Sequence, residues 1–167
     1  MLGLDGELVG WLGTLSLGAA IRSNEWVIPT LQSIHIACIA LVFSAALMLN
    51  LRLLGVFART SPVAAVADRC VPQIWYLTLG LLVSGSMLII GEPRRALHSP
   101  AFAIKMILLA VAVALTWFLH RRVRDDAKRP DRSAAAPMEY RVLGAISTVV
   151  WVGIIFAGRW IAYWHSR

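Results

Sequence analysis

Three basic side chains lie inside long apolar segments of this sequence, where an ionisable group is costly and usually has a function. His35 lies six residues after Pro29, Lys105 lies five residues after Pro100, and Arg159 lies close to the end of the last apolar segment. At ~1.5 Å of rise per residue, each would lie ~6–10 Å below the end of a spanning helix. Since successive spans run in opposite directions, the three positions fall in one layer of the membrane. Such a layer suits an anionic group, a metal, or both.

Each of these residues also has an explanation without function. Lys105 and Arg159 have stems long enough to reach the headgroups from inside the membrane. The imidazole of His35 cannot reach that far, so its alternative is a buried neutral histidine bonded to a backbone carbonyl. Ser84 and Gly85 of another apolar segment reach a similar depth, and we expect them to line the same site.

Further basic residues lie just outside this layer. His98, in the connection after the second long apolar segment, and His165, near the C-terminus, are candidate metal ligands beside His35. Arg94 and Arg95 could pair with acidic groups of a ligand, because guanidinium groups bind carboxylates well.

The composition places these residues in a membrane protein. Of the 167 residues, 59% are hydrophobic and 15% are charged, against roughly 25% charged residues in soluble domains. The apolar residues form blocks of about 20, the length at which a helix crosses the hydrocarbon layer. The net charge of +7 lies on the flanks of these blocks and not along a basic stripe with interleaved aromatics. We therefore expect a lipid bilayer and no nucleic acid as partner.

Five apolar segments can be traced, of which four are long enough to span. The shortest, 8–20, would form ~20 Å of helix against a hydrocarbon layer of ~30 Å, so we expect it to lie in the interface or to re-enter the membrane partway, without spanning it. The expected fold is all-α, a transmembrane four-helix bundle with a short N-terminal interfacial helix, in a single integral membrane domain over 1–167. The predicted spans are about 29–51, 72–90, 101–120 and 140–164.

Three stretches of the sequence resemble an uncharacterised bacterial family of small four-helix membrane proteins. They are TLQSIHIACIALVFSAALMLNLRLLG, AFAIKMILLAVAVALTWFLH and the closing GRWIAY, and the resemblance extends from about Trp26 to Tyr163. More distantly, the histidine in the first span and the lysine that opens a later span, with a histidine at its end, resemble two other groups. These are the haem-containing protoporphyrinogen oxidases of bacteria and the CopD-type copper-resistance membrane proteins.

By this resemblance, His35 matches a haem-ligating histidine and Lys105 a functional lysine. The resemblance implies a b-type haem in the bundle, with Lys105, Arg159, Arg94 and Arg95 available to its propionates. The implied function is electron transfer or redox chemistry in the bacterial inner membrane, with a redox partner in the same membrane. Whether the chain is an enzyme stays open.

Two other classes of function fit the same residues. Gln32, His35 and Cys38 lie on one side of the first span and, with Met48 and Met87, offer ligands suited to copper. They favour a protein that binds or transports copper or another small ligand. A structural or accessory subunit, in which the polar layer only fixes helix packing, would need no cofactor. A homo-oligomer is compatible with each of these functions.

The distribution of Lys and Arg predicts the orientation in the membrane. Ten of these residues follow the first and third predicted spans, and five lie on the other side. Because positive residues favour the cytoplasm, we expect both termini outside the cytoplasm. The ten are Arg52, Arg59, Arg69, Arg121, Arg122, Arg124, Lys128, Arg129, Arg132 and Arg141.

A reporter enzyme fused after Arg167 tests this orientation. We expect a reporter that works only outside the cytoplasm to be active there, because the ten basic residues hold the opposite side in the cytoplasm. The matched control is the same reporter inserted in the connection 121–138, where it should be silent. A C-terminal fusion that is active only in the cytoplasm would contradict the prediction.

Overall fold

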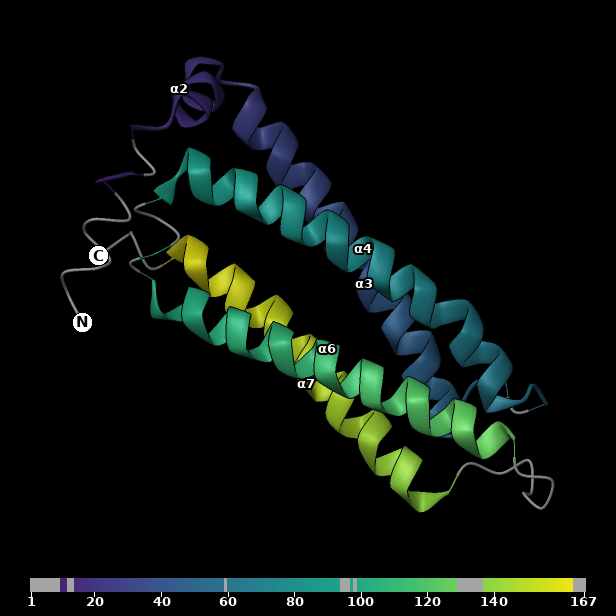
Figure 1. The fold of residues 1–167 in the computed structure, drawn as a ribbon. Helices are drawn as coiled ribbons and strands as arrows, with labels where there is room; N and C mark the ends of the chain where they lie inside the picture. The colour runs from purple at the N-terminus through teal and green to yellow at the C-terminus, as the bar shows by residue number, and fades with distance from the viewer. Residues whose placement is uncertain are drawn as a thin grey trace.

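In this computed structural model the protein is all-helical over the described residues, which are 10–11, 14–58, 60–93, 97, 99–128 and 137–163. Among these residues five helices follow one another and no strand occurs (Figure 1). The last four helices are long and apolar enough to cross a membrane, which confirms the predicted fold class. The helices are α2 (Ser16–Ser23), α3 (Val27–Leu53), α4 (Val63–Gly91), α6 (Pro100–Ala127) and α7 (Met138–Tyr163).

The four long helices alternate in direction and form two packed pairs. α3 packs along α4, and α6 packs along α7. The pairs meet through α3 on α7 and, less extensively, through α4 on α6 (Figure 1). α3 and α6 therefore lie diagonally across the bundle, and side chains that join them must meet in its interior.

The outside of the bundle carries many large apolar side chains. Ile36, Tyr76, Ile107 and Phe156 are large side chains, and they are between 65% and 77% exposed. In water such a surface would be a liability for aggregation, whereas lipid tails cover it readily. The exposed apolar surface therefore indicates a membrane protein independently of helix length.

Two helix boundaries lie outside the predicted spans. α4 begins at Val63, whereas the sequence predicts a span from Pro72, and α6 continues to Ala127, beyond the predicted end at His120. Pro72 lies exposed inside α4 and leaves the carbonyl of Asp68 without its usual helical partner. The exposed side chain of Asp68 marks this as a polar part of the helix, where solvent can satisfy the carbonyl.

The short helix α2 packs on the end of α4. Nη1 of Arg22 donates to the backbone carbonyl oxygens of Gly91, at 3.4 Å, and Ile90, at 3.5 Å. A Cβ at Gly91 would lie only 3.0 Å from Cγ2 of Ile21. With eight residues, α2 is ~12 Å long and too short to cross a membrane. Of the predicted interfacial segment 8–20, residues 8, 9, 12 and 13 lie outside the described residues.

α7 passes close to α3 at Gly144. A Cβ there would lie 3.1 Å from the Cβ of Leu53 and 3.3 Å from the carbonyl oxygen of Asn50. Both atoms are held by the backbone of α3, so neither can yield without moving the helix. Next to this crossing, the buried side-chain amide of Asn50 donates to Oγ of Ser147 at 3.2 Å. Small residues at such crossings let helices approach closely in lipid.

Gly144→Ala should therefore destabilise the bundle, by about 1–3 kcal/mol, the usual cost of overpacking. Gly153→Ala is the matched control on α7, because a Cβ there would meet the flexible Cδ1 of Leu108 at 3.3 Å. Thermal unfolding in detergent measures the difference. We expect a lower midpoint for Gly144→Ala than for Gly153→Ala, and equal midpoints would show that α3 and α7 do not cross this tightly.

Candidate functional site

A histidine, a serine and a lysine from three helices are joined in the interior of the bundle. Nδ1 of His35 (α3) lies 2.8 Å from Oγ of Ser84 (α4), and its Nε2 lies 3.3 Å from Nζ of Lys105 (α6). The Ser84 hydroxyl also lies 2.7 Å from the carbonyl oxygen of Gly80, one turn earlier in α4. These contacts form one continuous chain of hydrogen bonds. We refer to His35, Ser84 and Lys105 as the His35 site.

The chemistry of the partners assigns the protons along this chain. The carbonyl of Gly80 can only accept, so the single hydroxyl proton of Ser84 is donated to it. Oγ of Ser84 must then accept from His35, which places a proton on Nδ1. Nε2 is left as an acceptor for the amine of Lys105. The arrangement thus corresponds to a neutral imidazole in one tautomer, assigned from its partners.

Lys105 reaches His35 across the diagonal of the bundle. Its stem passes over Gly158 of α7, where a Cβ would lie 3.7 Å from Nζ and 3.8 Å from Cδ and Cε. On α4, Gly85 lies against the imidazole, and a Cβ there would be 3.3 Å from Cε1 of His35. All four spanning helices therefore contribute to the surroundings of the His35 site.

Small residues on one face of α4 allow the hydroxyl of Ser84 to reach the imidazole of His35. Gly80 and Ser84 are four residues apart, so they lie on the same side of the helix. A Cβ at Gly80 would lie 3.4 Å from Sγ of Cys38, which follows His35 by one turn of α3. α3 and α4 are consequently close enough for the short side chain of Ser84 to reach Nδ1 of His35.

The amine of Lys105 lies inside the bundle, next to the imidazole of His35. Among the residues that the structure describes, its polar contact is Nε2 of His35, and no carboxylate lies at ion-pair distance. A cationic group inside a membrane is costly unless it is paired or solvated. The site is therefore suited to an occupant that carries negative charge.

Arg159, which the sequence also predicts for the site, is not brought to the imidazole. The side chain of Arg159 is exposed, and its neighbour Gly158 is the residue of α7 that contacts Lys105. Within the described ranges, no three His, Cys, Asp or Glu side chains come together as metal ligands. The predicted site residues that lie outside the described residues are Arg94, Arg95, His98 and His165.

Two buried polar groups deeper in the bundle were not anticipated from the sequence. Oγ1 of Thr78 and Nε1 of Trp151 are buried and have no hydrogen-bond partner in the described part of the chain. Thr78 precedes Ser84 by six residues and Trp151 precedes Gly158 by seven, so both lie ~10 Å below the His35 site. A tryptophan in the middle of a span, and not at its end, is the signal that could have found Trp151.

Comparison with known proteins identifies a family but no characterised relative. Residues 8–164 match the model of a family described as a family of unknown function, DUF6644. No curated protein and no solved structure matches the chain.

Removing the Ser84 hydroxyl should allow both neutral tautomers of His35 to form. In protein labelled with ¹⁵N-histidine, nuclear magnetic resonance should show His35 protonated at Nδ1, and Ser84→Ala should show a mixture of tautomers. Ser86→Ala is the matched control, because Ser86 is exposed and donates to the carbonyl of Leu82 in its own helix at 2.7 Å. Unchanged His35 nitrogen shifts in Ser84→Ala would mean that Ser84 does not orient the ring.

Proposed function

This chain belongs to the DUF6644 family, and we propose that it is a membrane-embedded protein that binds a b-type haem and takes part in electron transfer or redox chemistry. One observation carries the proposal. His35 is held at Nδ1 by Ser84, while its Nε2 points to Lys105, which comes from the diagonally opposite helix. The nitrogen that would bind iron thus faces the interior of the bundle.

The hydrogen bond at Nδ1 supports His35 as an iron ligand. A histidine that binds a metal usually donates its other ring N–H to a neighbouring acceptor, which fixes the tautomer and the orientation of the ring. Ser84 is that acceptor here, and its own hydroxyl is held by the carbonyl of Gly80. The donor set of the His35 site therefore fits a haem with one protein ligand from α3.

The charge of Lys105 supports the same occupant. Its amine lies 3.3 Å from Nε2 of His35, so metal binding at that nitrogen requires the amine to move aside. A haem carries two propionates, and a carboxylate is a strong partner for an ammonium group. Because the flexible stem of Lys105 lies against Gly158, which has no side chain, the amine has freedom to turn towards such a group.

A b-type haem supplies reversible one-electron transfer at its iron when it is bound. His35 would hold the iron, Ser84 would keep the imidazole in place, and Lys105 would pair with a propionate. The apolar helices would keep water away from the group, and a redox partner in the same membrane would exchange electrons with it. We further propose Arg94, Arg95 and Arg159 as additional cations for the propionates, and His98 or His165 as a second iron ligand.

A structural role without a cofactor is the second candidate function. The hydrogen bonds of the His35 site favour this role, because they continue to the carbonyl of Gly80 and each group already has a partner. Hydrogen bonds between membrane helices contribute about 0.6 kcal/mol on average to stability. Copper is favoured less, since Sγ of Cys38 packs towards Gly80.

We also propose that the His35 site lies in the outer leaflet of the bacterial inner membrane, with both termini outside the cytoplasm. The support is the excess of Lys and Arg at the opposite end of the bundle, where α6 ends and α7 begins. An electron partner would then reach the haem from the outer side.

The visible absorption spectrum of the purified protein, produced in a host supplied with haem, tests the haem proposal. We expect a Soret band in the wild type and its loss in His35→Ala, because that substitution removes the iron ligand. Lys105→Met should retain less haem, since a propionate loses its partner. His120→Ala is the control, because His120 lies at the other end of the apolar part of α6.

Each outcome assigns the protein to one class. A wild type without a Soret band would contradict haem binding, and copper found by elemental analysis would then favour the copper alternative. If the wild type shows neither a Soret band nor bound copper, and His35→Ala lowers the midpoint of thermal unfolding, the protein would have the structural role. Unchanged haem content in His35→Ala would exclude His35 as the ligand.

A further inference from the structure

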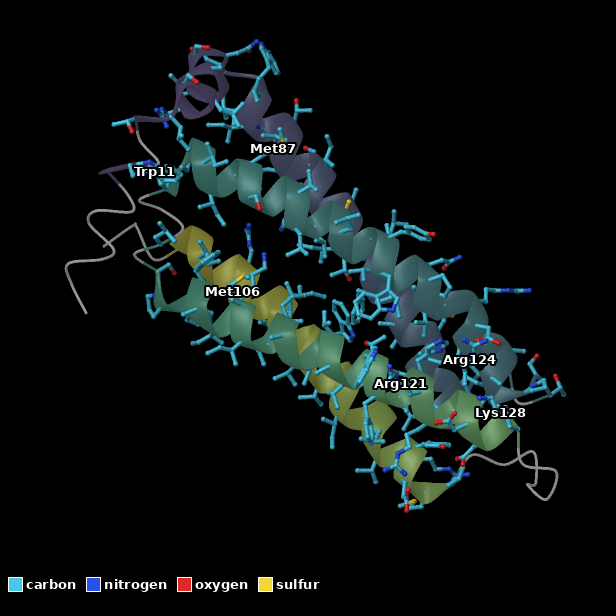
Figure 2. The ribbon with its side chains drawn as sticks, in the orientation of Figure 1. Trp11, Met87, Met106, Arg121, Arg124 and Lys128 are labelled. Atoms are coloured by element: carbon cyan, nitrogen blue, oxygen red, sulfur yellow. The ribbon has the colours of Figure 1, made fainter. Side chains whose placement is uncertain are left out.

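Two arginines near the end of α6 each lie over an aromatic ring one turn earlier in the same helix. Cζ of Arg121 is 4.0 Å from the centre of the Trp117 ring, and Cζ of Arg122 is 5.0 Å from the centre of the Phe118 ring. At these distances the face of the ring attracts the cation. We refer to Arg121 and Arg122 as the stacked arginines. Figure 2 labels Arg121 on the last turns of α6, followed by Arg124 and Lys128.

The rings under the stacked arginines face the lipid. Trp117 and Phe118 are 48% and 41% exposed, and they lie in the last turn of the apolar part of α6, which ends at Leu119. Aromatic rings in this position are typical of the boundary between hydrocarbon and headgroups. The stacked arginines therefore lie at the depth of the lipid phosphates.

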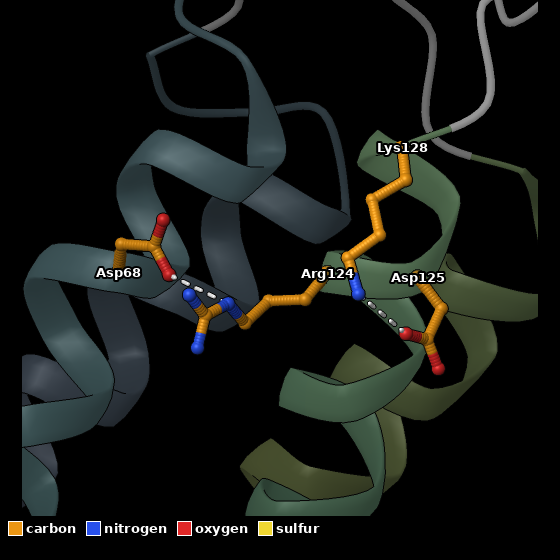
Figure 3. Close-up of polar contacts among 4 residues, drawn as sticks. All are labelled: Asp68, Arg124, Asp125 and Lys128. Atoms are coloured by element: carbon orange, nitrogen blue, oxygen red, sulfur yellow. Dashed lines mark ion pairs between the residues drawn. The ribbon is translucent and has the colours of Figure 1, made fainter.

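The next two cations of α6 already have acidic partners. Nε of Arg124 lies 3.7 Å from Oδ1 of Asp68, and Nζ of Lys128 lies 3.5 Å from Oδ1 of Asp125 (Figure 3). Within the described part of the chain, no carboxylate lies at ion-pair distance from the stacked arginines. The positive charge at this end of α6 that no described carboxylate pairs with thus lies above the two rings.

We propose that the stacked arginines bind the phosphate groups of anionic glycerophospholipids in the leaflet at this end of the bundle. A guanidinium group has five N–H donors in a planar fork that matches two phosphate oxygens. Consecutive residues lie ~100° apart around a helix, so the two pairs offer neighbouring phosphate positions on the lipid-facing side of α6. Trp117 and Phe118 would contact the glycerol and acyl parts of the same lipids, which a soluble anion does not have.

Lipid retention by the full chain tests this site. The protein is equilibrated in bilayer discs of equal parts phosphatidylcholine and phosphatidylglycerol, released into detergent, and its bound lipids are identified by native mass spectrometry. We expect the wild type to retain phosphatidylglycerol about fivefold or more over phosphatidylcholine, as expected for a basic residue at an anionic surface. The double variant Arg121→Gln/Arg122→Gln should lose this preference.

The matched control is Arg124→Gln/Lys128→Gln, which removes the same charge from the same helix and should keep the preference. Equal loss in both double variants would show that net charge alone attracts the lipid, and it would overturn the site, as would a wild type without preference. Displacement of the lipid by soluble glycerol phosphate would also contradict a lipid site. Circular dichroism confirms that each variant is folded, and haem retention provides an independent check at the far end of α6.

Discussion

A hydrogen-bonding group inside a lipid bilayer is costly unless the protein supplies its partner, and this cost explains how the helices around His35 are arranged. The backbone groups of a helix bond to one another, and many hydroxyls in the described part of the chain donate to a carbonyl of their own helix. Ser84, Thr116 and Thr148, for example, each donate to the carbonyl four residues earlier. The imidazole of His35 has two ring nitrogens that no such local bond serves. It therefore needs α4 on one side and α6 on the other, and the helices must come close enough to provide both.

The helices can approach one another this closely because glycines stand at a few of their contacts. Gly85 lies against the imidazole, Gly158 lies under the stem of Lys105, and Gly144 lies against the backbone of α3. α6 connects the two ends of the bundle, because it carries Lys105 near its start and the stacked arginines sixteen residues later, ~24 Å along the axis. Holding the arginines at the phosphates of one leaflet would fix the depth at which Lys105 meets His35.

Much of the architecture could be predicted from the sequence because it depends on length along the chain. Four blocks of apolar residues correspond to the four long helices, and the rise per residue places His35, Ser84, Gly85 and Lys105 at one depth. The boundaries were less predictable. Pro72 has the sequence pattern of a helix start, yet α4 begins at Val63, because a proline inside a helix is tolerated where solvent can satisfy the freed carbonyl.

The sequence by itself thus determined how deep each polar residue lies, but only the tertiary structure decided which of them meet. The sequence does not indicate which face of each helix points into the bundle, because faces that contact lipid are apolar like those that pack inside. Gly158 faces Lys105 while Arg159, rotated by ~100°, is exposed, and no pattern distinguishes the two positions. The same holds for Thr78, whose burial depends on how the helices pack.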